Sequence, residues 1–152
     1  DSYTMFESVA IVMQLLDEHP EKNLAPIVGT AERAHYYQWC VFASAEMDPP
    51  IMMYFDNTMR PLAHMKPVGA QHDPELAARG RHDFDVRAEA ISSALRDREY
   101  LLGSAFSGAD ILIGHCCFMA TFTGLLEGHP VLEAYYTRLQ QRPAYQRAYG
   151  TD

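Results

Sequence analysis

Two adjacent residues near the start of the chain, Glu7 and Ser8, have the chemistry needed to hold a small charged ligand. They lie in YTMFESVAI (3–11), where strand-forming residues run into a helix start. The first N–H groups of a helix are unpaired and its dipole is positive there, so Ser8 can bind a carboxylate while Glu7 pairs with an ammonium. A structural role is also open, in which Ser8 caps the helix and Glu7 favours the dipole.

A second set of candidates lies on the helix expected from Thr30 onward, with Thr30 predicted as its N-cap. Residues Tyr37, Val41, Ala45 and Asp48 follow helical spacing and can share one face. Tyr36 and Tyr37 offer hydroxyl groups, although aromatic residues on such a helix usually pack against a core. Trp39 is interpreted as a core residue.

The stretch FSGADILIG (106–114) contains a capping box of the S-x-x-D form, made by Ser107 and Asp110. Phe106 and Ile111 occupy the matching hydrophobic-staple positions. A catalytic carboxylate at Asp110 is the alternative, but the spacing matches the cap geometry and favours the structural role. The following ILIGHCCFMATF is apolar on nearly every side, which predicts a helix surrounded by other helices.

The three cysteines predict neither a disulfide framework nor a metal site. Cys116 and Cys117 are adjacent, and neighbours on a helix diverge by about 100°, so with His115 they do not form a tetrahedral site. Cys40 follows Trp39 in an apolar helix and is expected to be an inert buried thiol. Together with the absence of a visible signal peptide, this predicts a reducing cytoplasm.

The remaining pattern predicts a mostly helical chain. Asp73 and Pro74 form a clear helix opening, and Gly80 within that helix predicts a bend or fraying. Asp48-Pro49-Pro50 predicts a kink or break in the helix from Thr30. The expected segments are a helix over 7–17, one from 30 to 47 that resumes over 51–59, a loop over 60–74, a helix from 74 to about 98, a turn over 100–106 and two closing helices over 131–141 and 144–150.

Composition excludes some partners and raises a question about the start of the chain. The 152 residues can bury one core, and a net charge of -8 without a basic run argues against nucleic acid or an anionic membrane. The strand expected over SYTMF has no partner in the sequence, and a lone strand leaves its backbone groups unpaired. The sequence therefore predicts that the chain begins in the middle of a fold.

Five elements in order resemble one family. They are ESVAI (7–11), ERAHYYQW (32–39), LRDREYLLG (95–103), FSGADILIG and RLQQRPAYQRA (138–148). In this order they resemble the C-terminal two-thirds of a bacterial-type cytosolic glutathione transferase. The resemblance implies an all-α fold class, a C-terminal helical bundle preceded by the last strand and helix of a thioredoxin-like domain. Residues 1–20 would end that domain, 21–29 would be a linker, and 30–152 would form the helical domain.

The resemblance also implies an activity. Glutathione would be the co-substrate, its thiolate attacking an apolar electrophile, with Glu7 and Ser8 binding glutathione and no metal involved. The candidates for the electrophile site are Tyr36, Tyr37, Val41, Ala45 and Asp48, although the last three stand where some bacterial relatives carry polar groups that touch glutathione or substrate. No catalytic residue is assigned, because the activating Tyr, Ser or Cys would lie upstream, and these 152 residues alone should be nearly inactive.

The family implies a cytoplasmic homodimer used in detoxification. Two other functions stay open at this point. One is glutathione-dependent reduction or isomerisation on the same fold. The other is a non-catalytic module for protein association, because a fold does not fix a function.

Overall fold

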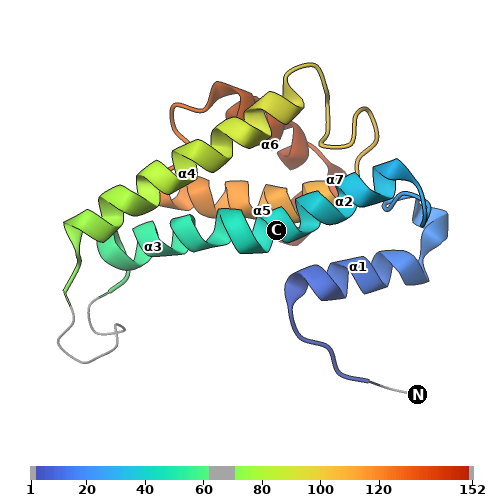
Figure 1. The fold of residues 1–152 in the computed structure, drawn as a ribbon, viewed down its shortest axis with the longest axis horizontal. Coiled ribbons are helices and arrows are strands. Elements are labelled where there is room, and N and C mark those ends of the chain that lie inside the picture. The colour runs from blue at the N-terminus through green and yellow to red at the C-terminus, as the bar shows by residue number, and fades with distance from the viewer. Residues whose placement is uncertain (1–2, 62–70, 151–152) are drawn as a thin grey trace.

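The computed structural model describes residues 3–61 and 71–150, which form a helical bundle (Figure 1). The elements are α1 (Ser8–Glu18), the 3-10 turn η1 (Pro20–Lys22), α2 (Ala31–Phe42), the π-helix η2 (Ala43–Met47), α3 (Asp48–Thr58), α4 (Pro74–Leu95), α5 (Gly108–Thr123), α6 (Pro130–Gln140) and α7 (Pro143–Tyr149). This confirms the all-α class.

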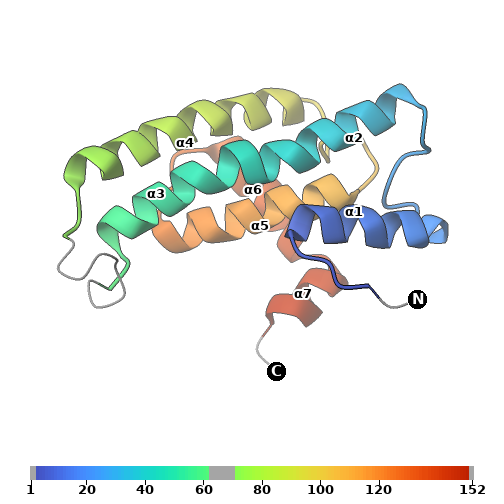
Figure 2. The same ribbon diagram turned by 60° about the horizontal axis from the view of Figure 1, so that its bottom comes forward.

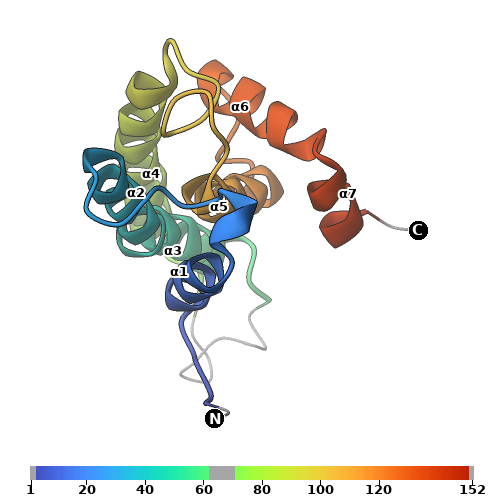
Figure 3. The ribbon, with the colours of Figure 1, turned by 90° about the vertical axis from the view of Figure 1, so that its right-hand side faces the viewer.

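The segment before α1 differs from the strand expected over SYTMF. Residues 3–7 are irregular and extend away from the bundle in Figures 1 and 3. The bridge between Tyr100 and Gly103 is the one β-type pairing in the described ranges. No strand among the described residues lies beside residues 3–7, so they cannot form a ladder.

The helix that begins after Thr30 is not broken at Asp48-Pro49-Pro50, contrary to the prediction. Figure 2 shows α2, η2 and α3 as one continuous rod. Proline has no N–H and clashes with the carbonyl of the preceding turn, which the wider π-helix accommodates. The Asp48 N–H accordingly donates to the Ala43 carbonyl, five residues back. The predicted cap is confirmed, since the Thr30 hydroxyl accepts from the Arg33 N–H at 3.2 Å.

Helix α4 opens as predicted but does not bend at Gly80. The Asp73 carboxylate accepts from the N–H groups of Glu75 and Leu76 at 2.9 and 3.2 Å. Gly80 is buried against α3, where a Cβ would lie 2.8 Å from the Tyr54 nitrogen and 2.9 Å from the Pro50 carbonyl oxygen. Glycine therefore allows α3 and α4 to approach closely.

Helix α5 is the centre of the bundle, as its sequence predicts. In the end-on view of Figure 3 the other helices surround it. Its buried residues belong to one core with side chains of α2, α3, α4 and α6, among them Tyr36, Trp39, Phe84, Ile91 and Leu132. The predicted core position of Trp39 is confirmed.

The remaining predictions concern connections. The turn over 100–106 is present, and the two predicted closing helices are present as α6 and α7, which begin at Pro130 and Pro143. The predicted loop over 60–74 lies mostly outside the described residues. Across the ranges that are described, no helix combines the length and apolar character that a membrane crossing requires.

Candidate functional site

The start of α1 has an unusual backbone at Glu7. Glu7 is the N-cap residue with φ 72° and ψ 108°, a positive φ that residues other than glycine seldom adopt. Such strain costs about 1–3 kcal/mol and is concentrated at functional sites. The same segment brings together Glu7 and Ser8, both exposed.

Ser8 does not cap α1, which was the structural role open to it. No side chain among the described residues caps α1, and Ser8 is its first residue rather than its cap. The first intrahelical bond runs from the Ile11 N–H to the Glu7 carbonyl at 3.0 Å. The N–H groups of residues 8–10 precede it, so the helix start retains donors for a ligand.

A buried arginine fixes the other end of α1. Arg33 of α2 is 3% exposed, and its Nη2 lies 2.6 Å from Oδ1 of Asp17. Its Nη1 donates to the Pro26 carbonyl at 2.9 Å, and its guanidinium lies 4.7 Å from the ring centroid of Tyr37. One side chain thus joins α1, the following segment and α2. This role of Arg33 was not predicted, because its partner Asp17 is 16 residues away in the chain.

The middle of α1 packs on the first turn of α5. A Cβ at Gly108 would lie 2.5 Å from Leu16 Cδ1 and 3.2 Å from Val12 Cγ1. The Gly108 N–H donates to the Leu24 carbonyl at 2.8 Å. The absence of a side chain at Gly108 therefore sets the distance between α1 and α5.

The structure brings together three of the five candidates for the electrophile site. Tyr37, Val41 and Ala45 line one shallow, open depression on α2 and η2, with Val41 55% exposed. Tyr36 is fully buried and belongs to the core, and burial raises the pKa of its hydroxyl. Tyr36 therefore does not line an open site, which corrects its place among the candidates.

Asp48 is turned toward α5. It begins α3, is partly buried, and its Oδ1 accepts a hydrogen bond from Cys116 Sγ at 3.4 Å. The same thiol lies 3.6 Å from the carbonyl oxygen of Ala43 in the π-helix. The contact between Cys116 and Asp48 joins α5 to α3, and the sequence does not reveal it.

Asp110 is part of the scaffold, and the predicted capping box is confirmed. Its carboxylate is fully buried and accepts from the Ser107 N–H at 2.8 Å and the Ser107 hydroxyl at 3.0 Å. It also accepts from the Leu101 N–H at 3.0 Å and the Tyr135 hydroxyl at 2.9 Å. Burial raises the pKa of Asp110, against the opposing effect of these donors.

The cysteines lie in the core. Cys40 and Cys117 are fully buried, and burial raises the pKa of Cys40 to about 11 and that of Cys117 to about 12. A thiol becomes reactive only as the thiolate, so neither residue provides a nucleophile near neutral pH. The predicted inert character of Cys40 agrees with this burial.

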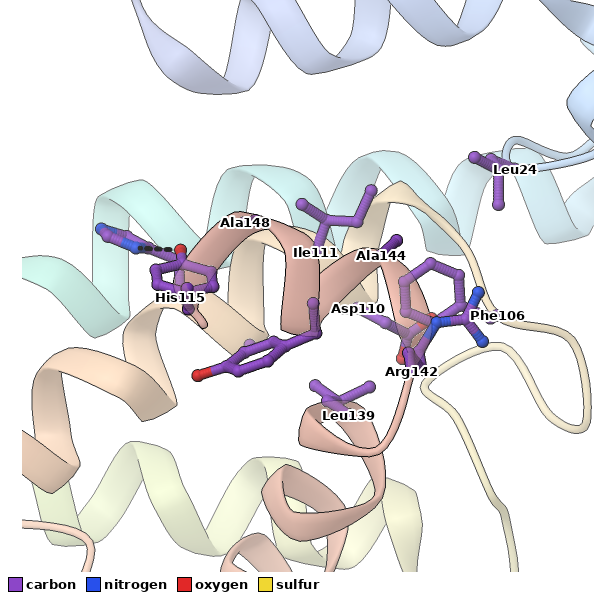
Figure 4. Close-up of a pocket in the computed structure, with 12 residues that line it drawn as sticks. Leu24, Phe106, Asp110, Ile111, His115, Leu139, Arg142, Ala144 and Ala148 are labelled. Carbon is purple, nitrogen blue, oxygen red and sulfur yellow. Dashed lines mark hydrogen bonds between the residues drawn. The ribbon is translucent and has the colours of Figure 1, made fainter. Parts of the chain in front are cut away.

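An apolar cavity of about 250 Å³ lies between α5 and α7 (Figure 4). At one end, His115 Nδ1 and the Tyr149 hydroxyl are 3.3 Å apart. At the other end, the Arg142 guanidinium lies 3.5 Å from the ring centroid of Phe106. Asp110 lines this cavity too, but its four hydrogen bonds serve the fold.

Comparisons with known proteins place the chain among longer relatives. No family model matches it. It is 24% identical to glutathione S-transferase GstA of Escherichia coli O157:H7 over 153 residues, covering 100% of this chain and 70% of that protein.

Two solved structures are also similar. The bacterial GST BphK, in a ternary complex, is 30% identical with a TM-score of 0.82 over 97% of this chain and 68% of BphK. A sphingomonad glutathione S-transferase complexed with glutathione is 24% identical with a TM-score of 0.80, over 97% of this chain and 67% of that one. The chain thus spans about two thirds of each relative.

Proposed function

The chain belongs to the bacterial glutathione S-transferase family, and from this premise we propose that it forms part of a subunit that conjugates glutathione to apolar electrophiles. The observation that carries the proposal is the start of α1, where a strained Glu7 precedes the exposed Ser8 and no side chain among the described residues caps the helix. Glutathione is the co-substrate in this proposal.

The chemistry of the ligand matches that helix start. The γ-glutamyl end of glutathione carries a carboxylate and an ammonium group. Ser8 would donate its N–H and hydroxyl to the carboxylate, aided by the helix dipole. Glu7 would accept from the ammonium as a charge-assisted pair. The strained backbone at Glu7 then serves to direct its side chain toward the ligand.

We propose that residues 1–20 belong to a thioredoxin-like domain, 21–29 to a linker and 30–152 to the helical domain. Helix α1 supports this division. Its sequence is apolar, yet none of its residues is buried and Leu15 is 48% exposed. Such a helix has one side available for a further element. The residue that lowers the thiol pKa of glutathione would come from that domain.

The electrophile would lie against the rod of α2, η2 and α3. Tyr37, Val41 and Ala45 offer an open apolar surface. Asp48 lies outside this depression and contacts Cys116 of α5 instead. An apolar electrophile gains affinity from such a surface by losing contact with water. The full subunit is proposed to form a homodimer in the cytoplasm, where the three free cysteines stay reduced and detoxification takes place.

A transferase assay tests this function. The 152-residue chain and the same chain extended by an upstream thioredoxin-like domain would be assayed with glutathione and 1-chloro-2,4-dinitrobenzene. The proposal expects turnover from the extended protein and almost none from the chain alone. Comparable turnover by both would contradict it. Retention on immobilised glutathione without turnover would instead favour the non-catalytic module.

A further inference from the structure

Three arginines surround one groove outside the site described above. Arg96 and Arg98 follow the end of α4, and Arg138 lies on α6. All three line a hollow of about 320 Å³. Its other lining residues are mostly apolar, namely Leu95, Pro130, Val131, Ala134 and Tyr135.

Backbone contacts hold these arginines at one place. The Arg98 N–H donates to the Leu95 carbonyl at 3.0 Å, which turns the chain back at the end of α4. Arg138 Nη1 donates to the Glu99 carbonyl at 2.7 Å, which ties α6 to the same turn. A guanidinium has five N–H donors, so most of those of Arg138 are left for a ligand.

The three arginines lack the partners that other arginines of this chain have. Arg33, Arg60 and Arg87 each lie within 3.1 Å of a carboxylate oxygen. In contrast, no carboxylate within the described ranges is within 4.0 Å of a nitrogen of Arg96, Arg98 or Arg138. Asp97 and Glu99 alternate with them in sequence, yet neither lines the groove.

The local charge runs against that of the whole molecule. The chain has a net charge of -8, whereas three positive charges line this one groove. The negative end of the α4 dipole stabilises the positive charge of Arg96, which directly follows that helix. This effect falls off within the last turn, so it does not explain Arg138 on α6. A bound anion would offset the mutual repulsion of the three guanidinium groups.

We propose that this groove binds a phosphate monoester. The planar guanidinium fork matches the geometry of phosphate oxygens, and a dianion suits three cations. The apolar walls would contact the organic body of the ester, and the volume falls in the range of small-molecule sites. This proposal is independent of glutathione, because the groove contains none of the residues proposed for that ligand.

Calorimetric titration of the 152-residue chain tests the proposal with three probes at low ionic strength. 1-Naphthyl phosphate is expected to bind, inorganic phosphate to bind more weakly for lack of an apolar body, and neutral 1-naphthol not to bind measurably. Added NaCl should weaken the binding, because Arg96 and Arg98 are exposed and Arg138 is half-buried. Equal affinity for inorganic phosphate, or binding of 1-naphthol as tight as that of the ester, would overturn the assignment.

Variants locate the binding in the groove. Arg96→Gln and Arg98→Gln should each raise the Kd for 1-naphthyl phosphate about tenfold, the loss expected for one charge-assisted contact. Ala134→Glu places a carboxylate among the arginines and should abolish binding. Arg79→Gln, an exposed arginine elsewhere on α4, is the matched control and should leave the Kd unchanged. An unchanged Kd in the double variant Arg96→Gln/Arg98→Gln would contradict the proposal, with circular dichroism verifying that each variant is folded.

Discussion

Arg33 Nη2 lies 2.6 Å from Asp17 Oδ1, which joins a buried guanidinium of α2 to the last turn of α1. The pair is asymmetric, since the side chain of Arg33 is 4% exposed and that of Asp17 is 44% exposed. Solvent screens the attraction on the Asp17 side. The role of Arg33 therefore includes its backbone contact with Pro26 and its stacking on Tyr37.

Replacing Arg33 should destabilise the protein more than replacing its partner. Arg33→Met removes the hydrogen bonds to Asp17 and Pro26 and is expected to cost about 2 kcal/mol of unfolding free energy. Asp17→Asn should cost about 1 kcal/mol or less, because Asp17 reaches solvent. Urea unfolding followed by circular dichroism measures both. Equal losses in the two variants would show that the ion pair, rather than the burial of Arg33, dominates.

Gly80→Ala should destabilise the protein although alanine is the better helix former. The intrinsic helix preference favours alanine by about 1 kcal/mol. The new Cβ would lie 2.8 Å from the Tyr54 nitrogen, and such overpacking typically costs about 1–3 kcal/mol. The net loss of unfolding free energy is measured from the shift of the urea unfolding midpoint. Ser93→Ala, at an exposed position on the same helix, is the control and should be neutral or slightly stabilising.

Tyr135→Phe tests the support of the buried Asp110. The substitution removes the hydroxyl that donates to Asp110 at 2.9 Å and leaves the other three donors in place. A loss of about 1–2 kcal/mol is expected, because a buried charged acceptor loses one bond. Thermal unfolding measures it. Tyr136→Phe is the control, since its hydroxyl contacts Tyr145 instead of Asp110, and a larger loss there would argue against a special role for Asp110.

The buried thiol of Cys40 should make the stability of the protein depend on pH. Burial raises the pKa of Cys40 from 9.0 to about 11, so the folded state holds this proton more tightly than the unfolded state. The stabilisation is present below pH 9 and is lost as the pH rises toward 11. Stability should thus fall over this range, and less steeply in Cys40→Ala. At pH 8 a thiol reagent should react with the native protein far more slowly than with the denatured protein.

Local features of the fold were predictable from the sequence. The caps at Thr30 and Asp73 and the capping box of Ser107 and Asp110 are confirmed, because each depends on residues within a few positions of one another. The continuous rod across Asp48-Pro49-Pro50 and the straight helix at Gly80 were predicted wrongly. The π-helix accommodates the prolines, and Gly80 packs against α3. Local helix propensity predicts neither feature.

The candidate site shows the same division. The spacing predicted one face for Tyr37, Val41, Ala45 and Asp48, and the first three do line one depression. Asp48 does not line it, because the π-helix that precedes Asp48 changes the helical spacing. For Tyr36 both core packing and a site role were open, since the sequence does not show which side of α2 faces α5, and the structure shows core packing. The roles of Arg33 and Cys116 were also missed, because their partners Asp17 and Asp48 are distant in sequence.

Equilibrium binding of glutathione to the protein extended by its proposed thioredoxin-like domain tests the central proposal most directly. Ser8→Ala removes the hydroxyl at the start of α1 and should weaken glutathione binding about tenfold or more, the loss expected when a charged ligand group loses a donor. Ser44→Ala, an exposed serine in the π-helix, is the matched control and should bind as the unmodified protein does. If Ser8→Ala and Ser44→Ala bound glutathione with the same affinity as the unmodified protein, the start of α1 would not be its binding site.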